Sequence, residues 1–169
     1  LDEALAILKP MLADPGILKV GHNLKYDLAI LGKYDIEVTP FDDSMLLSYC
    51  LDAGKNGHSM DELALRLLNH NTIKFSDVAG TGKNQKTFDE VPLDKATDYA
   101  AEDAEITLKL YRLLKTRLQL EHLNTVYERI ERPLVPVITQ METTGIKVDP
   151  LVLKNLDDDF TKRLLVLEE

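Results

Sequence analysis

The chain has 169 residues, of which 44% are hydrophobic and 29% charged, an ordinary globular composition that excludes intrinsic disorder and a collagen-like fold. Its 20 basic and 29 acidic residues give a net charge of −9, which argues against affinity based on phosphate neutralisation but does not exclude a nucleic-acid enzyme whose carboxylates hold metal ions. One cysteine, Cys50, excludes an intramolecular disulfide framework and a multi-cysteine zinc site, and with no apolar run of about 20 residues and no signal peptide we expect a cytoplasmic protein without a membrane segment.

The first half of the chain alternates helical patterns with short apolar stretches. Asn23 is a plausible N-cap for a helix that follows a strand. The predicted elements are a helix over 2–13, a buried strand over 17–21, a helix over 23–33, a second short strand over 36–38, a loop over 40–43 and a helix over 44–51.

The second half is predicted to be mainly helical. Ser59 and Glu62 have the spacing of a capping box, which marks the start of a helix. Pro133 and Pro136 indicate a bend or a restart within a later helix. The predicted elements are a helix over 59–68, an irregular segment over 69–95, a long helix over 94–120, a helix over 126–143 and an extended piece over 146–149.

A first candidate site follows the strand predicted over 17–21. There an amide and a carboxylate, Asn23 and Asp27, are four residues apart, so they share one face of the next helix. The carboxyl ends of strands are the usual position of a site in an α/β protein. The plainer alternative is that Asn23 only caps the helix and Asp27 is only a solvated helix residue.

A second candidate site lies on the long helix over 94–120. Tyr99 and Asp103 share a helical face, and small alanines around them allow a ligand or another backbone to approach closely. The alternative is a tyrosine packed on the core, with its hydroxyl bonded to a nearby acceptor.

Together these two segments resemble a specific family. Asn-x-x-x-Asp after a strand, followed by Tyr-Ala-Ala-Glu-Asp-Ala over 99–104, is similar to the second and third motifs of the tyrosine subclass of DEDD-type 3′→5′ exonucleases. The segments over 130–149 and 80–88 resemble the start of the polymerase domain and a loop in the bacterial DNA polymerase I family. The first motif of the family, Asp-x-Glu on an early strand, does not precede Asp27.

This resemblance implies an α/β fold of the ribonuclease H-like 3′→5′ exonuclease type, truncated at the N-terminus and therefore rich in helix with few strands. Both ends of the sequence fall inside helical patterns, so we expect a piece of a longer polymerase chain. The expected division is a partial exonuclease domain over 1–125 and the start of the polymerase domain over 126–169.

The resemblance also implies a mechanism for this chain. Two divalent ions, Mg²⁺ or Mn²⁺ with Zn²⁺ as an alternative at one position, would serve hydrolysis of the 3′-terminal phosphodiester of single-stranded DNA. Asp103 would bind the ion that activates the attacking water, and Asp27 would hold the second ion largely through water. Tyr99 would orient the attacking water, because an unperturbed phenol is a poor base at neutral pH.

Contacts to the DNA strand are expected from four further residues. Tyr26 and Phe75 occupy positions that resemble the DNA-contacting aromatic positions of the family, and stacking accepts any base. His22 and Asn23 are expected to reach the terminal sugar-phosphate. For Phe75 the alternative is a core aromatic residue.

Two rival functions remain open from the sequence. One is an RNA-trimming exonuclease of the same superfamily, against which the resemblance over 130–149 argues. The other is a non-catalytic domain that supports the polymerase or binds DNA. The 169 residues alone are expected to be a very poor nuclease; if they were active, another carboxylate such as Asp42 or Glu102 would have to serve the metals.

Overall fold

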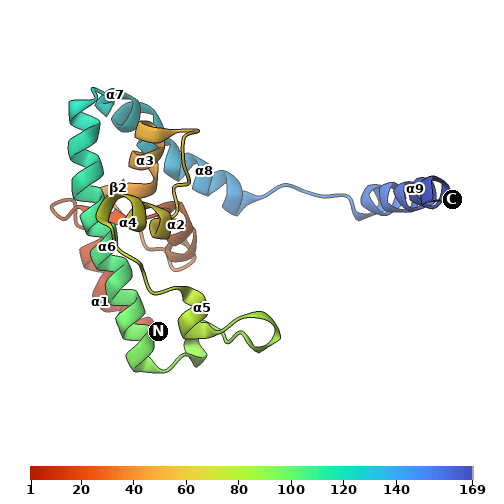
Figure 1. Ribbon diagram of the computed structural model, residues 1–169, viewed down its shortest axis with the longest axis horizontal. Helices are drawn as coiled ribbons and strands as arrows, with labels where there is room; N and C mark the ends of the chain where they lie inside the picture. The colour runs from red at the N-terminus through yellow and green to blue at the C-terminus, as the bar shows by residue number, and fades with distance from the viewer. Residues whose placement is uncertain (169) are drawn as a thin grey trace.

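The computed structural model describes residues 1–168, and of Asn84 only the backbone. Helices dominate the described chain, which also holds a small sheet (Figure 1). In chain order the elements are α1 (Asp2–Ala13), β1 (Lys19–Gly21), α2 (Leu24–Gly32), β2 (Phe41–Asp43), α3 (Ser44–Asp52), α4 (Met60–Leu68), α5 (Phe75–Ala79), η1 (Gly82–Asn84), η2 (Phe88–Glu90), α6 (Leu93–Leu120), α7 (Asn124–Val126), η3 (Tyr127–Glu131), α8 (Arg132–Thr144) and α9 (Pro150–Glu168).

The sheet of the described residues consists of β1 and β2, which run parallel and are joined through α2. Lys19 pairs with Phe41, and Gly21 pairs with Asp43. Both strands therefore end at the same level, and each is followed closely by a helix, α2 after β1 and α3 after β2. The starts of α2 and α3 therefore lie side by side at the carboxyl ends of the two strands.

The core is built around α6, a helix of 28 residues. Its buried face is apolar at intervals of four residues, the spacing that keeps side chains on one side of a helix. Removing each such leucine from water contributes about 1.5–3 kcal/mol. The core cluster consists of Leu47, Leu51, Leu63, Ala64, Ile106, Leu110, Leu114, Leu118 and Tyr127.

The sequence prediction of the sheet was only partly right. The strand predicted over 17–21 is present as β1, but the strand predicted over 36–38 is absent and the predicted loop contains β2. Ile36 and Val38 are buried, at 5% and 6% exposure, without pairing in a ladder. Their β-branched apolar pattern thus reflects burial alone.

The prediction of helices was more accurate. Ser59 caps α4, since its hydroxyl accepts from the Glu62 amide at 3.4 Å and donates to the Glu62 carboxylate at 3.0 Å. The segment predicted as irregular contains α5 and two short 3₁₀ turns, η1 and η2. Near Pro133, the structure has a π-helical turn, η3, directly before α8.

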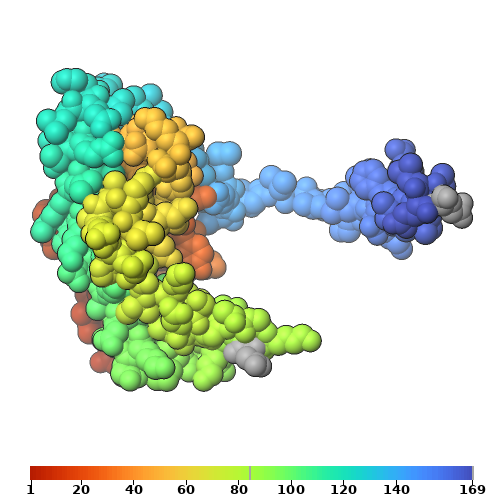
Figure 2. Space-filling view, in the orientation of Figure 1, coloured from red at the N-terminus to blue at the C-terminus, as the bar shows by residue number. Residues whose placement is uncertain are grey.

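The last helix stands apart from the rest of the molecule. Figures 1 and 2 show α9 at the end of a thin extended connection, away from the other helices. None of its residues is buried, and residues 141–150 are exposed. By contrast η3 and α8 pack on the body, and Tyr127 of η3 is completely buried in the core. Along residues 1–168 no helix combines the length and apolar character needed to cross a bilayer.

Candidate active site

Asp103 lies on α6, partly exposed, with one buried atom in an unusual situation. Its Oδ1 is shielded from solvent and, among the described residues, has no hydrogen-bond partner. Burial raises the pKa of the Asp103 carboxyl, and the negative charges of Asp61 and Glu102 raise it further, while the Tyr99 hydroxyl acts in the opposite direction. An unpartnered buried carboxylate oxygen is costly unless another group binds it.

Tyr99 lies one turn before Asp103 and joins an aromatic cluster. Its ring centroid is 6.1 Å from that of Phe75 and 5.9 Å from that of Phe88. Phe75 and Phe88 remain 38% and 42% exposed, so the cluster opens to solvent. Phe88 was not singled out from the sequence, although an aromatic residue that ends a polar loop was a signal for it.

Burial, together with the charge of Asp103, raises the pKa of the Tyr99 hydroxyl. This phenol therefore remains protonated at neutral pH and acts as a hydrogen-bond donor. Phe75 and Tyr99 meet edge to face, at an interplanar angle of 70°. The structure thus brings together three predicted site residues: Phe75, Tyr99 and Asp103.

Asp27 lies in the first turn of α2, beyond the carboxyl end of β1. Partial burial raises the pKa of the Asp27 carboxyl, and the charge of Asp43 raises it further. The carboxyl pKa is thus raised at both Asp27 and Asp103, and the causes are burial and acidic neighbours other than each other. That Asp27 and Asp103 hold two ions of one site, as the resemblance implies, stays a prediction.

The start of α2 is held by Asp43, not by the predicted cap Asn23. Asn23 occupies the N-cap position in a left-handed conformation (φ 61°), and its side chain forms no capping hydrogen bond. Instead the Asp43 carboxylate accepts from the amides of Asn23 at 3.2 Å and Leu24 at 2.7 Å. Asp43 is 2% exposed and is the last residue of the neighbouring strand, β2. The sequence pattern did not indicate that it would cap α2.

His22 is held on both sides of its ring. Its Nδ1 pairs with the Ser44 hydroxyl at 2.9 Å, and its Nε2 lies 3.1 Å from the carbonyl oxygen of His58. A carbonyl only accepts, so Nε2 carries a hydrogen. Burial lowers the pKa of His22, against the charges of Asp43 and Asp61. The ring therefore supports the turn between β1 and α2.

The other residues expected to contact DNA are accessible. Tyr26 is 67% exposed, and Asn23 is also exposed at the start of α2. The site residues form two groups, one at the start of α2 and one made by α6 and Phe75 of α5. The charge of Asp61, in the first turn of α4, acts on both groups: it opposes the lowering of the His22 pKa by burial and adds to the raised pKa of Asp103. Within residues 1–168 no three His, Cys, Asp or Glu side chains are grouped as a metal site.

The two alternative carboxylates already have partners. Asp42 is 2% exposed and binds Tyr127 at 2.9 Å, Arg132 at 2.8 Å and Lys115 at 3.2 Å; although burial alone would raise its pKa, these groups lower it. Glu102 accepts from the Ile73 amide at 2.6 Å and pairs with His70 at 2.8 Å. Both carboxylates stabilise the fold.

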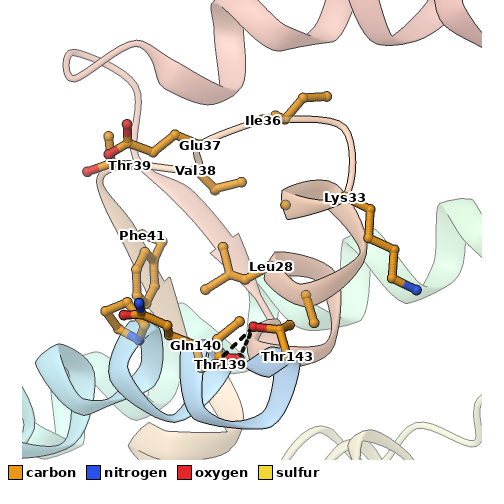
Figure 3. A pocket seen from close by; sticks show the side chains of 13 residues that line it. Leu28, Lys33, Ile36, Glu37, Val38, Thr39, Phe41, Thr139, Gln140 and Thr143 are labelled. Atoms are coloured by element: carbon orange, nitrogen blue, oxygen red, sulfur yellow. Dashed lines mark hydrogen bonds between the residues drawn. The ribbon is translucent and has the colours of Figure 1, made fainter. Parts of the chain in front are cut away.

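A cavity of about 500 Å³ lies on a different part of the molecule. It is bounded by α2, the segment before β2, and α8, and Figure 3 shows Leu28 and Val38 extending toward each other across it. Thr139 and Thr143 of α8 complete the lining and are joined by a hydrogen bond of 2.9 Å from the Thr143 hydroxyl to the Thr139 carbonyl. No predicted site residue lines this cavity.

Comparisons with known proteins show the family to which the chain belongs. Residues 1–119 match the model of a protein family described as 3′→5′ exonuclease. DNA polymerase I of Rhizobium leguminosarum is 50% identical over 167 residues, which are 99% of this chain and 16% of that protein. DNA polymerase I of Pseudomonas aeruginosa is 41% identical over 171 residues, 99% of this chain and 19% of that protein. The chain thus spans less than a fifth of the length of these relatives.

Two solved structures show the same fold. The POL domain of Pol1 from M. smegmatis, in complex with DNA primer-template and dNTP, superimposes with a TM-score of 0.72 at 23% identity over 96% of this chain and 25% of that one. Brucella melitensis NrnC bound to pGG superimposes with a TM-score of 0.66 at 20% identity over 83% of this chain and 64% of that one. The fold is thus of the helix-rich, ribonuclease H-like exonuclease type. With this fold and the match over residues 1–119, the chain belongs to the 3′→5′ exonuclease family of DNA polymerase I.

Proposed function

We propose that this chain is the proofreading exonuclease part of a cytoplasmic bacterial DNA polymerase I. It removes nucleotides from the single-stranded 3′ end of DNA, with residues 1–125 as the exonuclease part and residues 126–169 as the start of the polymerase domain. The observation that carries the proposal is the buried Asp103 Oδ1, which has no hydrogen-bond partner among the described residues and lies one turn from Tyr99. That oxygen is available to bind a ligand.

Divalent cations fit these residues. Mg²⁺ and Mn²⁺ prefer oxygen ligands, and the unpartnered Asp103 oxygen has the required chemistry. In the proposal Asp103 and Asp27 hold two such ions, with Zn²⁺ as the alternative at one position. When bound, the ions supply Lewis acidity and lower the pKa of the attacking water.

Tyr99 has the role of orienting that water. Its hydroxyl keeps its proton at neutral pH, because a phenol loses its proton only far above pH 7 and because burial and Asp103 raise the pKa of Tyr99 further. A protonated phenol donates a hydrogen bond to one lone pair of the water oxygen and so holds the water in a fixed orientation, with its other lone pair left for the attack. Tyr99 is therefore an orienting residue and does not act as the general base.

The DNA strand is proposed to bind along the exposed aromatic residues. Phe75, in its open cluster, and the exposed Tyr26 offer stacking surfaces that accept any base. Asn23 is proposed to contact the terminal sugar-phosphate. Both ring nitrogens of His22 already have partners within the protein. We therefore propose that His22 holds the turn at Gly21–Asn23 and does not itself contact the sugar-phosphate.

The test uses the full-length polymerase with labelled single-stranded DNA, an RNA of the same sequence, and Mg²⁺ or Mn²⁺. We expect 3′ nucleotides to be released from DNA faster than from RNA, and Asp103→Asn to abolish the release while primer extension continues. Release that survives Asp103→Asn would contradict the proposed site. Faster release from RNA would favour an RNA-trimming exonuclease, and no release from either substrate would favour a non-catalytic domain.

A further inference from the structure

Asp43 connects two helix starts with one side chain. Its Oδ1 accepts from the amides of Met45 at 2.8 Å and Leu46 at 3.3 Å, which begin α3. The same oxygen accepts from Asn23, and Oδ2 accepts from Leu24 at the start of α2. A carboxylate beside two helix N-termini also interacts favourably with the positive end of each helix dipole. The position of α2 relative to α3 is thus set through this group.

Among the described residues, no other side chain caps α2. Asn23 is left-handed and its side chain does not bond to the helix, so the first amides of α2 depend on Asp43. Asp27 lies in that same first turn, three residues after Leu24. A shift of the first turn therefore moves Asp27 directly.

Asp43 itself is fixed from the opposite side. Its backbone amide donates to the Tyr127 hydroxyl at 2.9 Å, and that hydroxyl donates to Asp42 at 2.9 Å. Asp43 also pairs with Gly21 at the end of the sheet. These contacts hold the backbone from which the Asp43 carboxylate reaches the start of α2.

From these contacts we infer that Asp43 is a positioning residue of the exonuclease site, which acts by fixing the first turn of α2 and with it the Asp27 carboxylate. This inference rests on the proposed function of Asp27. Groups that support metal ligands typically affect metal affinity or activity by about 10-fold to 100-fold when they are lost.

The discriminating variant is Asp43→Ser in the full-length polymerase. Serine is a good N-cap and its hydroxyl still serves α3, but it is too short to reach Leu24 as well. The variant thus removes the support of α2 and keeps that of α3. Asp43→Asn is the second variant: its amide oxygen replaces Oδ1, while its NH₂ group faces the Leu24 amide and cannot accept from it.

The matched control is Asp42→Asn. Asp42 is the preceding residue of β2, is equally buried at 2% exposure, and binds Tyr127, Arg132 and Lys115. It makes no hydrogen bond to α2. A general weakening of β2 would therefore be visible in this control as well.

Two measurements do not depend on hydrolysis. Hydrogen exchange of the metal-free protein, read by mass spectrometry over residues 19–31, should be about 5-fold faster in Asp43→Ser, as expected for loss of a helix cap. Mn²⁺ titration should show about 10-fold or more weaker binding in Asp43→Ser and near wild-type binding in Asp42→Asn. In Asp43→Ser the exonuclease turnover number should fall by a similar factor. The KM for DNA should rise by a smaller factor.

Three results would overturn the inference: unchanged exchange over residues 19–31, faster exchange with unchanged Mn²⁺ affinity, or an equal loss of Mn²⁺ affinity in Asp42→Asn. Failure of the proposed function would be seen separately, as hydrolysis that survives Asp103→Asn. Exchange and Mn²⁺ binding would still decide the role of Asp43, because neither measures hydrolysis.

Discussion

Tyr99 and Asp103 lie one turn apart on α6, and the charge of Asp103 acts on the Tyr99 hydroxyl. Because the hydroxyl is proposed to act on the attacking water, Tyr99→Phe should lower the exonuclease turnover by roughly 10² to 10³-fold, as for loss of one catalytic hydrogen-bond donor. Binding of single-stranded DNA should change little, since the ring remains in its cluster with Phe75 and Phe88. Single-turnover rates and DNA dissociation constants measure the two effects; equal losses in both would make Tyr99 a binding residue.

Asp103 should also weaken the fold when no metal is present. Burial raises the pKa of its carboxyl above the ordinary value of 3.8, so the folded state binds a proton more tightly than the unfolded state. Stability then falls as the pH rises through 3.8 to the raised pKa and stays reduced above it.

Asp103→Asn should consequently raise the melting temperature at neutral pH in EDTA, and the gain should shrink as the pH is lowered toward about 4. Added Mn²⁺ should stabilise the wild type more than the variant, because the ions bind the carboxylate in the folded state. Thermal unfolding by circular dichroism at several pH values is the measurement. A variant less stable than the wild type at neutral pH in EDTA would contradict the raised pKa.

At the level of elements, the contact of η3 with β2 rests on the buried Tyr127. Tyr127→Phe keeps the ring in the core but leaves the Asp43 amide and one oxygen of Asp42 without this partner. An unsatisfied buried polar group costs about 1–3 kcal/mol, so the free energy of unfolding should fall by about that much. Urea unfolding measures it, with the exposed Tyr34→Phe as a control that should stay within about 0.5 kcal/mol of the wild type.

The elements that local patterns determine were predictable, and those that depend on distant residues were not. The apolar spacing over 94–120 predicts α6 to within a residue, because helix periodicity and core burial coincide there. β2 was missed, since Asp42 and Asp43 are unusual in a strand and are stabilised by Lys115, Tyr127 and Arg132 far along the chain.

The same holds for the site. The spacing of Tyr99 and Asp103 on one helix face is readable from the sequence, because four residues always return to the same side of a helix. The cap of α2 cannot be read from the sequence. Asn23 fits the pattern of a cap, but the group that actually caps the helix is Asp43, which the pairing of β1 with β2 brings to it.

For the whole molecule, the boundary of the folded unit is expected to differ from the proposed boundary between the exonuclease and polymerase parts after residue 125. A chain of residues 1–145 lacks α9, in which no described residue is buried, so its unfolding free energy should stay within about 0.5 kcal/mol of that of residues 1–169. A chain of residues 1–125 lacks Tyr127, and loss of a buried aromatic residue costs about 3–5 kcal/mol. Thermal unfolding of both chains tests this; equal stability of the two would contradict the importance of η3 for the core.

The double cap by Asp43 has a consequence for the order of events during synthesis. α2 has nine residues, and isolated helices shorter than about 12–15 residues are marginal in water. Its cap lies 20 positions after Asn23, so the helix that carries Asp27 gains its support only once β2 has been translated and paired. We expect α2 to become protected together with β2 and α3 in pulse-labelled refolding. Earlier protection of α2 would show that the nascent segment holds itself without Asp43.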